Sequence, residues 1–336
     1  MYDLSKCTRC GDCLLRCQYI NYDRPKIAYE LNNILEGKNS DILWDCIVCS
    51  ACNEYCLEGV NLAEWIQELQ EKYKVEVGPE KSVRMLDRIP TLSSNVVTGD
   101  LSDSNKSVLS LCAMRGWIPK GSLEGQMFDN LTQIELGDYF DYFAYLHVGK
   151  VSYIRKNVEK FVGALAGLGR EEIIFIHDEC IATLNMAREW GIKVPFKPVN
   201  ILAYLLNYLK EHKSNITKLN RKIAYQRPCS SRYVPENEPL LEELFELIGV
   251  ERVIRRYDRQ EALCCGGLFA YYALPWVKKV QDMNVTDALG YRAEAMIFLC
   301  HGCLVGIGQH CLERGLKAIH VIDLARMALG EISFPS

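Results

Sequence analysis

Two different spacings of apolar residues divide this chain. In residues 62–73 (LAEWIQELQEKY) the apolar side chains recur three or four positions apart, as they do on one face of a helix: Leu62, Trp65, Ile66, Leu69 and Tyr73. Residues 30–37 (ELNNILEG) are also helix-like. After residue 107, apolar runs that suit buried strands alternate with helical stretches. The pattern predicts an α+β chain, with a mainly helical N-terminal part followed by α/β structure.

The α/β part contains an internal duplication. Residues 173–184 (IIFIHDECIATL) align with residues 296–307 (MIFLCHGCLVGI) at an offset of 123, and each segment is an apolar strand that runs into a turn and a helix. The same offset matches Asn200 with Asp323. Residues 199–206 match 322–329 at this offset, and upstream residues 107–116 correspond to 222–232. We therefore predict two Rossmann-like α/β repeats with parallel strands.

Residues 76–107 interrupt both spacings. They are rich in Ser, Asn, Asp and Gly and contain no cysteine, which predicts a linker along the surface of the next domain. The predicted organisation is then a helical domain at 1–75, the linker at 76–107, a first α/β domain at 108–220 and a second at 221–336.

Composition and charge restrict the classes of function. The chain has 336 residues, of which 49% are apolar and 24% charged, as in a soluble globular protein. Its net charge of −4 gives no electrostatic reason to expect nucleic acid or an anionic membrane as a partner. The N-terminus lacks the apolar core of a signal peptide, and the most apolar helical stretch, 199–210, is too short to cross a bilayer. We expect a cytoplasmic protein without a transmembrane segment, whose association with a membrane would be peripheral and through a partner.

Sixteen cysteines change this picture. In a small secreted domain they would indicate disulfides, whereas clustered cysteines in a reducing compartment more often bind metals. Two runs in the helical domain have the spacing C-x2-C-x2-C-x3-C: Cys7, Cys10, Cys13 and Cys17, then Cys46, Cys49, Cys52 and Cys56. Zinc sites instead favour isolated C-x2-C pairs.

Three thiolates at this spacing hold three corners of an Fe4S4 cube, and the fourth cysteine of each run ligates the other cluster. The predicted ligands are Cys7, Cys10, Cys13 and Cys56 for one cluster, and Cys46, Cys49, Cys52 and Cys17 for the other. The segment resembles an eight-cysteine ferredoxin domain, although Gln18 and Leu57 stand where the bacterial pattern has proline. It is similar to the helical ferredoxin of the C subunits of heterodisulfide reductases and of the iron–sulfur subunits of succinate dehydrogenase-like enzymes.

Five more cysteines fall in three loop regions of the second α/β half: Cys229, Cys264, Cys265, Cys300 and Cys303. Converging thiolates would repel one another, so a polynuclear metal centre is the favoured explanation. Gly266 and Gly267 allow backbone N–H groups to approach its sulfurs.

Residues 229–303 resemble the five-cysteine CCG motif. The motif occurs in the B and D subunits of heterodisulfide reductase and in iron–sulfur subunits of glycolate, glycerol-3-phosphate and lactate oxidising enzymes. The resemblance implies a noncubane Fe4S4 cluster, in which one of the paired cysteines can bridge two irons. Structural zinc on four of the five cysteines is the alternative.

The first half keeps only part of this motif. Cys112 and Cys180 remain, His177 stands where the repeat predicts a cysteine, and the position of the CC pair falls in 137–150, which contains no cysteine. Three interpretations follow. The two thiols are inert remnants, or they bind zinc with His177 and one more donor, or His177, Asp178 and the aromatic residues of this segment shape a pocket.

These observations predict an iron–sulfur electron-transfer subunit of a heterodisulfide reductase-like oxidoreductase complex. Two Fe4S4 cubanes would exchange electrons with the CCG cluster. The chain has neither a phosphate-binding GxxxxGK[ST] motif nor GxGxxG after a strand, so we expect a partner subunit to carry flavin. Two alternatives are a disulfide or thiol reductase that acts at the CCG cluster, and the iron–sulfur subunit of a flavin-dependent hydroxyacid or glycerol-3-phosphate dehydrogenase. A third is a binding scaffold with structural zinc.

Overall fold

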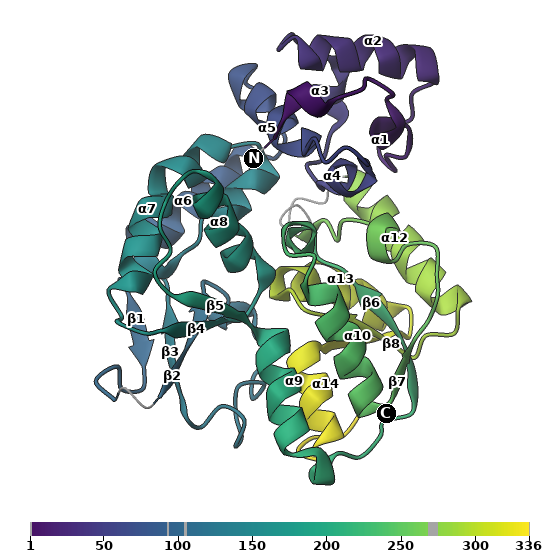
Figure 1. Cartoon of the computed structure of the whole chain (residues 1–336). Coiled ribbons are helices and arrows are strands. Elements are labelled where there is room, and N and C mark those ends of the chain that lie inside the picture. The colour runs from purple at the N-terminus through teal and green to yellow at the C-terminus, as the bar shows by residue number, and fades with distance from the viewer. Residues whose placement is uncertain (1, 93, 104–105, 268–274, 336) are drawn as a thin grey trace.

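The computed structural model describes residues 2–92, 94–103, 106–267 and 275–335. A helical N-terminal body lies at one end of two α/β units that stand side by side (Figure 1). The chain therefore combines helices with sheets rich in parallel strands, in agreement with the predicted α+β class.

The N-terminal body consists of short helices around a small apolar core. Its helical elements are η1 (Leu4–Lys6), α1 (Asp12–Leu15), α2 (Arg24–Leu35), α3 (Asp41–Asp45), α4 (Ala51–Tyr55) and α5 (Leu62–Lys72). Helix α2 begins at Asp23, whose carboxylate accepts the backbone N–H of Lys26 and caps the first turn. Helix α5 buries the predicted apolar face, and the indole of Trp65 donates a hydrogen bond to the carbonyl oxygen of Ile34 at 2.7 Å.

The first α/β unit is built on a five-stranded sheet with the order β1-β3-β2-β4-β5. The strands are β1 (Val96–Thr98), β2 (Ser107–Cys112), β3 (Leu131–Glu135), β4 (Glu172–Phe175) and β5 (Lys197–Asn200). Strand β1 is antiparallel to β3, and the other pairs are parallel. The helical elements are η2 (Arg115–Trp117), η3 (Gly137–Tyr139), η4 (Phe143–Val148), α7 (Val151–Ala166), α8 (Asp178–Glu189), α9 (Ile201–Glu211) and η5 (Lys213–Asn215).

The second unit has a four-stranded parallel sheet with the order β7-β6-β8-β9. Its strands are β6 (Arg221–Gln226), β7 (Val250–Arg252), β8 (Ala295–Phe298) and β9 (Lys317–His320). The helical elements are η6 (Ser230–Tyr233), α10 (Asn237–Ile248), η7 (Arg259–Glu261), α12 (Pro275–Gly290), α13 (His301–Glu313) and α14 (Val321–Ala328). Apart from β1, the two sheets share one strand order.

The strand registers revise one match of the sequence comparison. Phe175 pairs with Asn200 in the first sheet, and Phe298 pairs with His320 in the second. Asn200 therefore corresponds to His320 and not to Asp323, because the connection in the second unit is three residues shorter. Both residues cap the helix that follows: the side chain of Asn200 accepts the N–H of Leu202, and that of His320 the N–H of Ile322.

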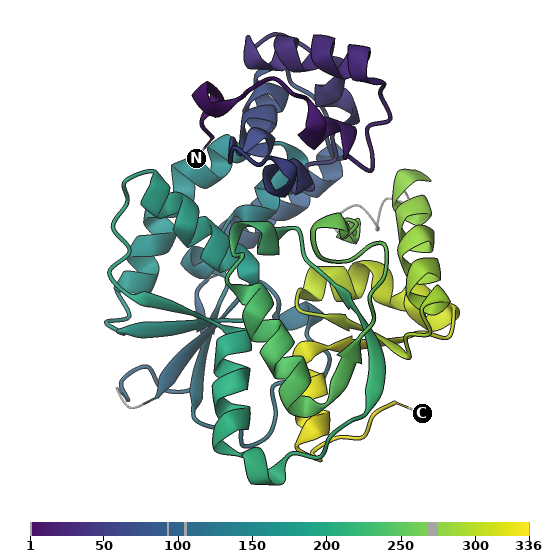
Figure 2. The same cartoon turned by 45° about the vertical axis from the view of Figure 1, so that its right-hand side comes forward.

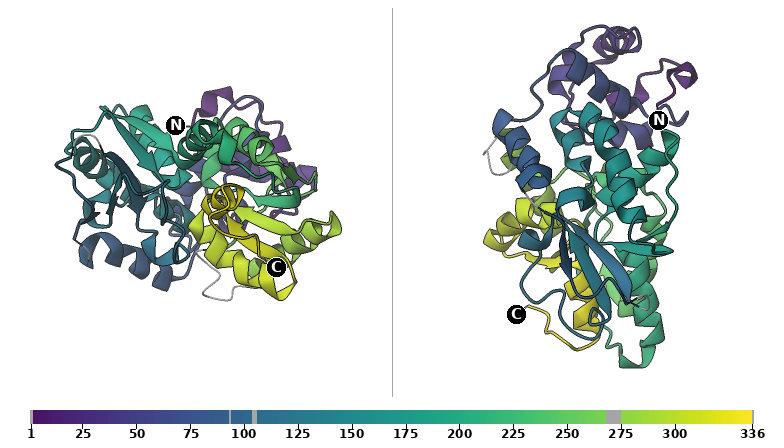
Figure 3. Two further views of the ribbon diagram at one scale, coloured as in Figure 1. Left: turned by 90° about the horizontal axis from the view of Figure 1, so that it is seen from below. Right: turned by 90° about the vertical axis from the view of Figure 1, so that its left-hand side faces the viewer.

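The two units share one hydrophobic core. Helices α9, α10 and α14 lie between the sheets, as Figure 2 and the view from below in Figure 3 show. Buried side chains of both units belong to a single cluster, among them Leu205, Leu244 and Leu324. Burial of each such leucine stabilises the folded chain by about 2 kcal/mol.

The described residues of the segment predicted as a linker belong to the first unit. They include α6 (Glu80–Leu92) and strand β1. Helix α6 packs against the first unit and buries Leu86 in its hydrophobic core. The Asp87 carboxylate accepts a hydrogen bond from the hydroxyl of Tyr145 at 2.7 Å. This corrects the prediction of a tether: the many polar residues obscured Val83, Leu86 and Ile89, which are three positions apart and form the apolar side of the helix.

Within the described residues, no helix combines the length and the apolarity that crossing a bilayer requires.

Candidate metal centre

The N-terminal body contains two sets of four cysteines: an outer set of Cys7, Cys10, Cys13 and Cys56, and an inner set of Cys17, Cys46, Cys49 and Cys52. Four sulfur side chains line one cavity of about 620 Å³: Cys7, Cys10, Cys13 and Cys56. Burial, and after it the charges of the three neighbouring thiols, raises the pKa of Cys13 to about 12. Cys10 is exposed. The four sulfurs that the crossed pattern predicts for one cluster therefore surround one space.

The inner set lies beside it. Burial and the nearby thiol of Cys49 raise the pKa of Cys46, and Cys17 contributes in the same direction. The remaining member, Cys52, has the thiols of both sets around it, because Cys13 and Cys46 both raise its pKa after burial. The backbone N–H of Val48 points at the Cys46 sulfur at 3.4 Å. Hydrogen bonds from N–H groups to the cysteine sulfurs are among the features that set the reduction potential of Fe4S4 clusters.

The two cysteine loops have the same backbone conformation. The second and fourth residues after the first cysteine are left-handed in both: Arg9 (φ 61°) and Gly11 (φ 76°), and Val48 (φ 54°) and Ser50 (φ 60°). Each non-glycine residue in this conformation costs roughly 1–3 kcal/mol and persists where its surroundings enforce it. Two loops strained at matching positions are consistent with two equivalent metal sites.

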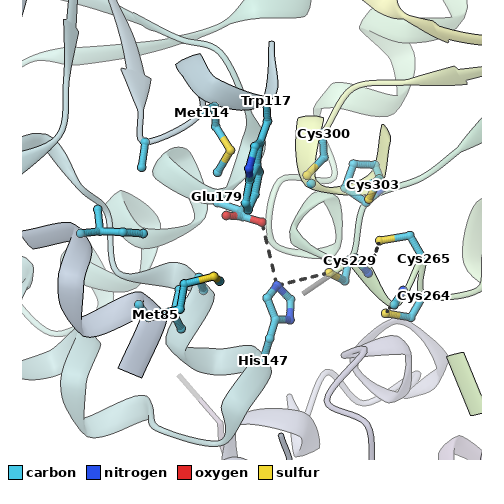
Figure 4. A pocket seen from close by; sticks show the side chains of 18 of the residues that line it. Met85, Met114, Trp117, His147, Glu179, Cys229, Cys264, Cys265, Cys300 and Cys303 are labelled. Carbon is cyan, nitrogen blue, oxygen red and sulfur yellow. Dashed lines mark hydrogen bonds and ion pairs between the residues drawn. The ribbon is translucent and has the colours of Figure 1, made fainter. Parts of the chain in front are cut away.

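The five CCG cysteines come from loops that follow three strands of the second sheet: Cys229 follows β6, Cys264 and Cys265 follow β7, and Cys300 and Cys303 follow β8. They line one cavity of about 280 Å³ between the two α/β units (Figure 4): Cys229, Cys264, Cys265, Cys300 and Cys303. Hydrogen bonds to Cys265 and Cys300, followed by burial, raise the pKa of Cys303. Cys265 in turn contacts Cys264, which senses the charge of Cys229. All five predicted sulfurs thus form one continuous group.

The two glycines after the paired cysteines direct N–H groups at the sulfurs. The N–H of Gly266 lies 3.4 Å from the Cys264 sulfur, and that of Gly267 lies 3.2 Å from the Cys265 sulfur. Gly266 has φ 68°, and a Cβ at Gly267 would overlap the carbonyl oxygen of Gly302 in α13. Only glycine allows this loop to lie so close to the helix.

The first unit and α6 form the other wall of the CCG cavity. It is mostly apolar and includes Met85, Leu86, Ile89, Met114, Trp117 and Phe140. One polar pair interrupts it: His147 Nε2 lies 3.7 Å from the Cys229 sulfur and 3.9 Å from Glu179 Oε1 (Figure 4). Burial alone would lower the pKa of His147, but Cys229 and Glu179 outweigh it and raise the pKa.

Sequence reasoning missed His147 and Glu179. A signal existed for His147, which lies in the segment 137–150 that the repeat comparison places opposite the CC pair. Glu179 lies between His177 and Cys180 in the first turn of α8.

The predicted residues of the first unit also come together. Cys112, His177 and Cys180 form a buried group with Asp141, and one ligand atom of each lies within 4.8 Å of those of the others. Asp178 is not part of it. The Asp178 carboxylate accepts hydrogen bonds from Asn200 and Asn237, both at 2.7 Å, and from Ser231, and so joins the two units.

The helical body and its cysteines define an iron–sulfur protein: residues 3–60 match the family described as a 4Fe-4S dicluster domain. The whole chain is similar to the D subunit of the dihydromethanophenazine:CoB–CoM heterodisulfide reductase of Methanosarcina acetivorans and to that of Methanosarcina mazei. Each is 22% identical, with 98% of this chain and 95% of the relative covered. The chain is an iron–sulfur protein that resembles the D subunit of heterodisulfide reductase, as the sequence predicted.

A solved structure shares the fold. It is a hypothetical protein from Helicobacter pylori, with a TM-score of 0.57 and 15% identity over 84% of this chain. The match spans 61% of that protein, less than two thirds of its length.

Proposed function

We propose that this chain is the electron-transfer subunit of a heterodisulfide reductase-like complex with three Fe4S4 centres. The proposed ligands are Cys7, Cys10, Cys13 and Cys56 for an outer cubane, Cys46, Cys49, Cys52 and Cys17 for an inner cubane, and Cys229, Cys264, Cys265, Cys300 and Cys303 for a noncubane cluster. Bound there, the clusters would supply one-electron transfer.

The direct contact between the inner set and the CCG loop is the observation that carries this proposal. Tyr19 follows the inner ligand Cys17 by two residues, and its hydroxyl oxygen accepts the backbone N–H of Cys264 at 2.7 Å. Arg232 lies near both Cys49 and Cys229: burial alone would lower its pKa, but the charges of Glu54 and of these two thiols outweigh burial and raise it. The order outer, inner, CCG is the linear arrangement that a relay needs.

A buried ion-pair cluster fixes the N-terminal body on the second unit. The carboxylate of Glu54 binds Arg227 through two hydrogen bonds, of 2.5 and 2.8 Å, and also binds Arg232. Both guanidinium groups are at most 5% exposed. A paired, buried network of this kind holds one orientation, which keeps the spacing between the inner and CCG sites constant.

The proposal includes a partner that carries flavin and exchanges electrons at the outer set, where Cys10 is exposed. The relatives' names describe them as a subunit, and this chain contains no flavin-binding motif that we recognise. Native mass spectrometry of the protein from its source cells is expected to find a complex. An isolated monomer would contradict the partner.

Iron analysis and EPR test the three centres. Protein prepared without oxygen is expected to contain about twelve irons per chain, four for each centre. Cys264→Ser should reduce this to about eight and remove one EPR signal, while the two cubane signals remain. Cys311→Ser is the matched control, because Cys311 is a buried thiol that contacts the Met296 sulfur. About eight irons in the unaltered protein would contradict a cluster at the CCG site.

The CCG cavity favours a second function, the reduction of an organic disulfide with an apolar arm. The apolar wall containing Trp117 suits such an arm, and His147 lies beside Cys229. Cleavage of one S–S bond takes two electrons and two protons and yields two thiols. The electrons would come from an external reductant through this chain.

A low-potential dye assay separates the two functions. Turnover of a disulfide by the chain alone would establish the reductase, and Trp117→Ala should then raise KM more than it lowers kcat. Turnover only with the partner would favour the relay.

A further inference from the structure

We propose that Cys112, Asp141, His177 and Cys180 bind one zinc ion in the first α/β unit. The four residues come from three loops at the carboxyl ends of parallel strands: Cys112 ends β2, Asp141 follows β3, and His177 and Cys180 follow β4. This is the edge of an open α/β sheet at which ligands bind. Asp141 is the fourth donor that the sequence left unassigned.

The distances suit a single small cation. The Cys180 sulfur lies 3.5 Å from His177 Nε2, which lies 3.8 Å from Asp141 Oδ2. All four ligand atoms lie within 4.8 Å of one another. A tetrahedral zinc with bonds of about 2.0–2.3 Å spaces its ligands about 3.3–3.8 Å apart. The group would therefore close by no more than about 1 Å.

An unpartnered carboxylate oxygen faces the centre of this group. Asp141 is 1% exposed, and its Oδ2 accepts no hydrogen bond from the described residues. Its Oδ1 accepts the backbone N–H of Phe143 at 2.9 Å. Burial of a polar atom without a partner costs several kcal/mol, and a bound cation removes that cost.

The far side of the imidazole has the partner that metal-binding histidines use. With Nε2 directed at the group, His177 Nδ1 lies 3.6 Å from Glu179 Oε2. A carboxylate in this position fixes the ring and its tautomer and strengthens the metal bond. The other oxygen of Glu179 faces His147 at the CCG cavity, so the proposed ligand His177 is connected to Cys229 through one carboxylate and one further imidazole.

The ligand chemistry selects zinc over an iron–sulfur cluster. Two thiols, one imidazole and one carboxylate are too few sulfurs for the cysteine-held clusters of the other sites, but they match the mixed tetrahedral sites of zinc. All four residues are at most 1% exposed, so the site is closed and structural. Cys112 is held in the left-handed region, at φ 57°, beside a bulge in β2. That strain would be offset by the metal bond.

Metal analysis and X-ray absorption of the unaltered protein test the proposal. The oxygen-free preparation, washed with a weak chelator, is expected to contain about one zinc per chain. The zinc spectrum should show two sulfur ligands at about 2.3 Å and two nitrogen or oxygen ligands at about 2.0–2.2 Å. Zinc surrounded by four sulfurs, no zinc, or iron in excess of about twelve per chain would each overturn it.

Variants identify the ligands. Asp141→Ala and Cys180→Ala are expected to lose the zinc, whereas Glu179→Gln should weaken its binding about 10–100-fold in a chelator competition. Asp138→Ala is the control, because Asp138 is near in sequence but pairs with Lys160 at 2.7 Å. Retention of zinc by both ligand variants would overturn the assignment. Iron content and EPR signals are measured on the same samples, so failure of the cluster proposal is separately visible.

Discussion

His320 shows how one buried side chain makes stability depend on pH. Its Nε2 donates a hydrogen bond to the Leu299 carbonyl oxygen at 2.7 Å, and its Nδ1 accepts the N–H of Ile322 at 3.3 Å. The ring stacks on His301, with 3.9 Å between centroids. Burial lowers the pKa of His320 to about 4, although the Leu299 hydrogen bond acts in the opposite direction. Protonation at Nδ1 would break the cap of α14.

We predict that this histidine destabilises the protein as the pH falls. Its pKa in the folded state is below the value of about 6.5 in the unfolded chain, so the unfolded chain binds the proton first. Stability should therefore be full above pH 6.5 and should fall by about 2 kcal/mol between pH 7 and pH 5. His320→Asn keeps a cap, as Asn200 does in the first unit, and should remove this part of the slope. Urea unfolding of both proteins at pH 7, 6 and 5 measures the free energy of unfolding. An equal decrease with falling pH in both proteins would contradict the role of His320.

At the scale of elements, one close backbone contact determines whether the CCG centre can form. It lies between α13 and the loop that contains Cys264, Cys265, Gly266 and Gly267. Gly267 lies against Gly302 and Gly306, and a Cβ at Gly306 would overlap the Cα of Gly267. Helix α13 begins at His301 with Cys300 as its N-cap residue, so the same contact positions Cys300 and Cys303 opposite the paired cysteines. The glycines thus set the distance between two halves of one ligand group.

Gly267→Ala is expected to prevent assembly of the CCG centre without affecting the N-terminal body. The added methyl group has to displace α13 or the loop, and such overpacking costs about 1–3 kcal/mol. Iron should fall from about twelve to about eight per chain. Gly290→Ala is the control, because a Cβ there meets nothing within 4 Å. Unchanged iron in Gly267→Ala would show that the loop can move.

Elements with regular spacing could be predicted from the sequence, and contacts between loops could not. The apolar face of α5, the alternation of strands and helices, and the three cysteine groups all rest on fixed intervals along the chain. Asp141, His147 and Glu179 carry no such interval, because parallel strands bring their loops together from distant parts of the chain. Asn200 was matched with Asp323 because a fixed offset cannot detect a connection that is three residues shorter.

At the scale of the whole molecule, Glu54 holds the N-terminal body on the second unit. It lies in α4, and Arg227 and Arg232 follow β6. Arg16 and Glu261 add a second ion pair across the same boundary at 2.6 Å, but both side chains are 42% exposed, so that pair contributes little. The buried group carries the attachment.

Glu54→Ala should loosen the N-terminal body. Two buried guanidinium groups would lose the carboxylate they share, which costs about 3 kcal/mol or more. We expect a lower midpoint of thermal unfolding and faster hydrogen exchange in α4. Glu58→Ala removes an exposed carboxylate nearby and should change stability by no more than about 0.5 kcal/mol. Identical exchange in the two variants would contradict the role of Glu54.

The wall that the first unit gives to the CCG cavity has a consequence for how this chain can diverge. The first unit contains only two cysteines, Cys112 and Cys180, and its sequence could be expected to vary freely elsewhere. Here its Met114, Trp117 and Phe140 still enclose the neighbour's sulfurs, and α9 still fills the space between the sheets. Besides its proposed zinc ligands, the first unit therefore has an apolar surface that stays under the same constraint as an interface between two proteins, enclosed within a single polypeptide.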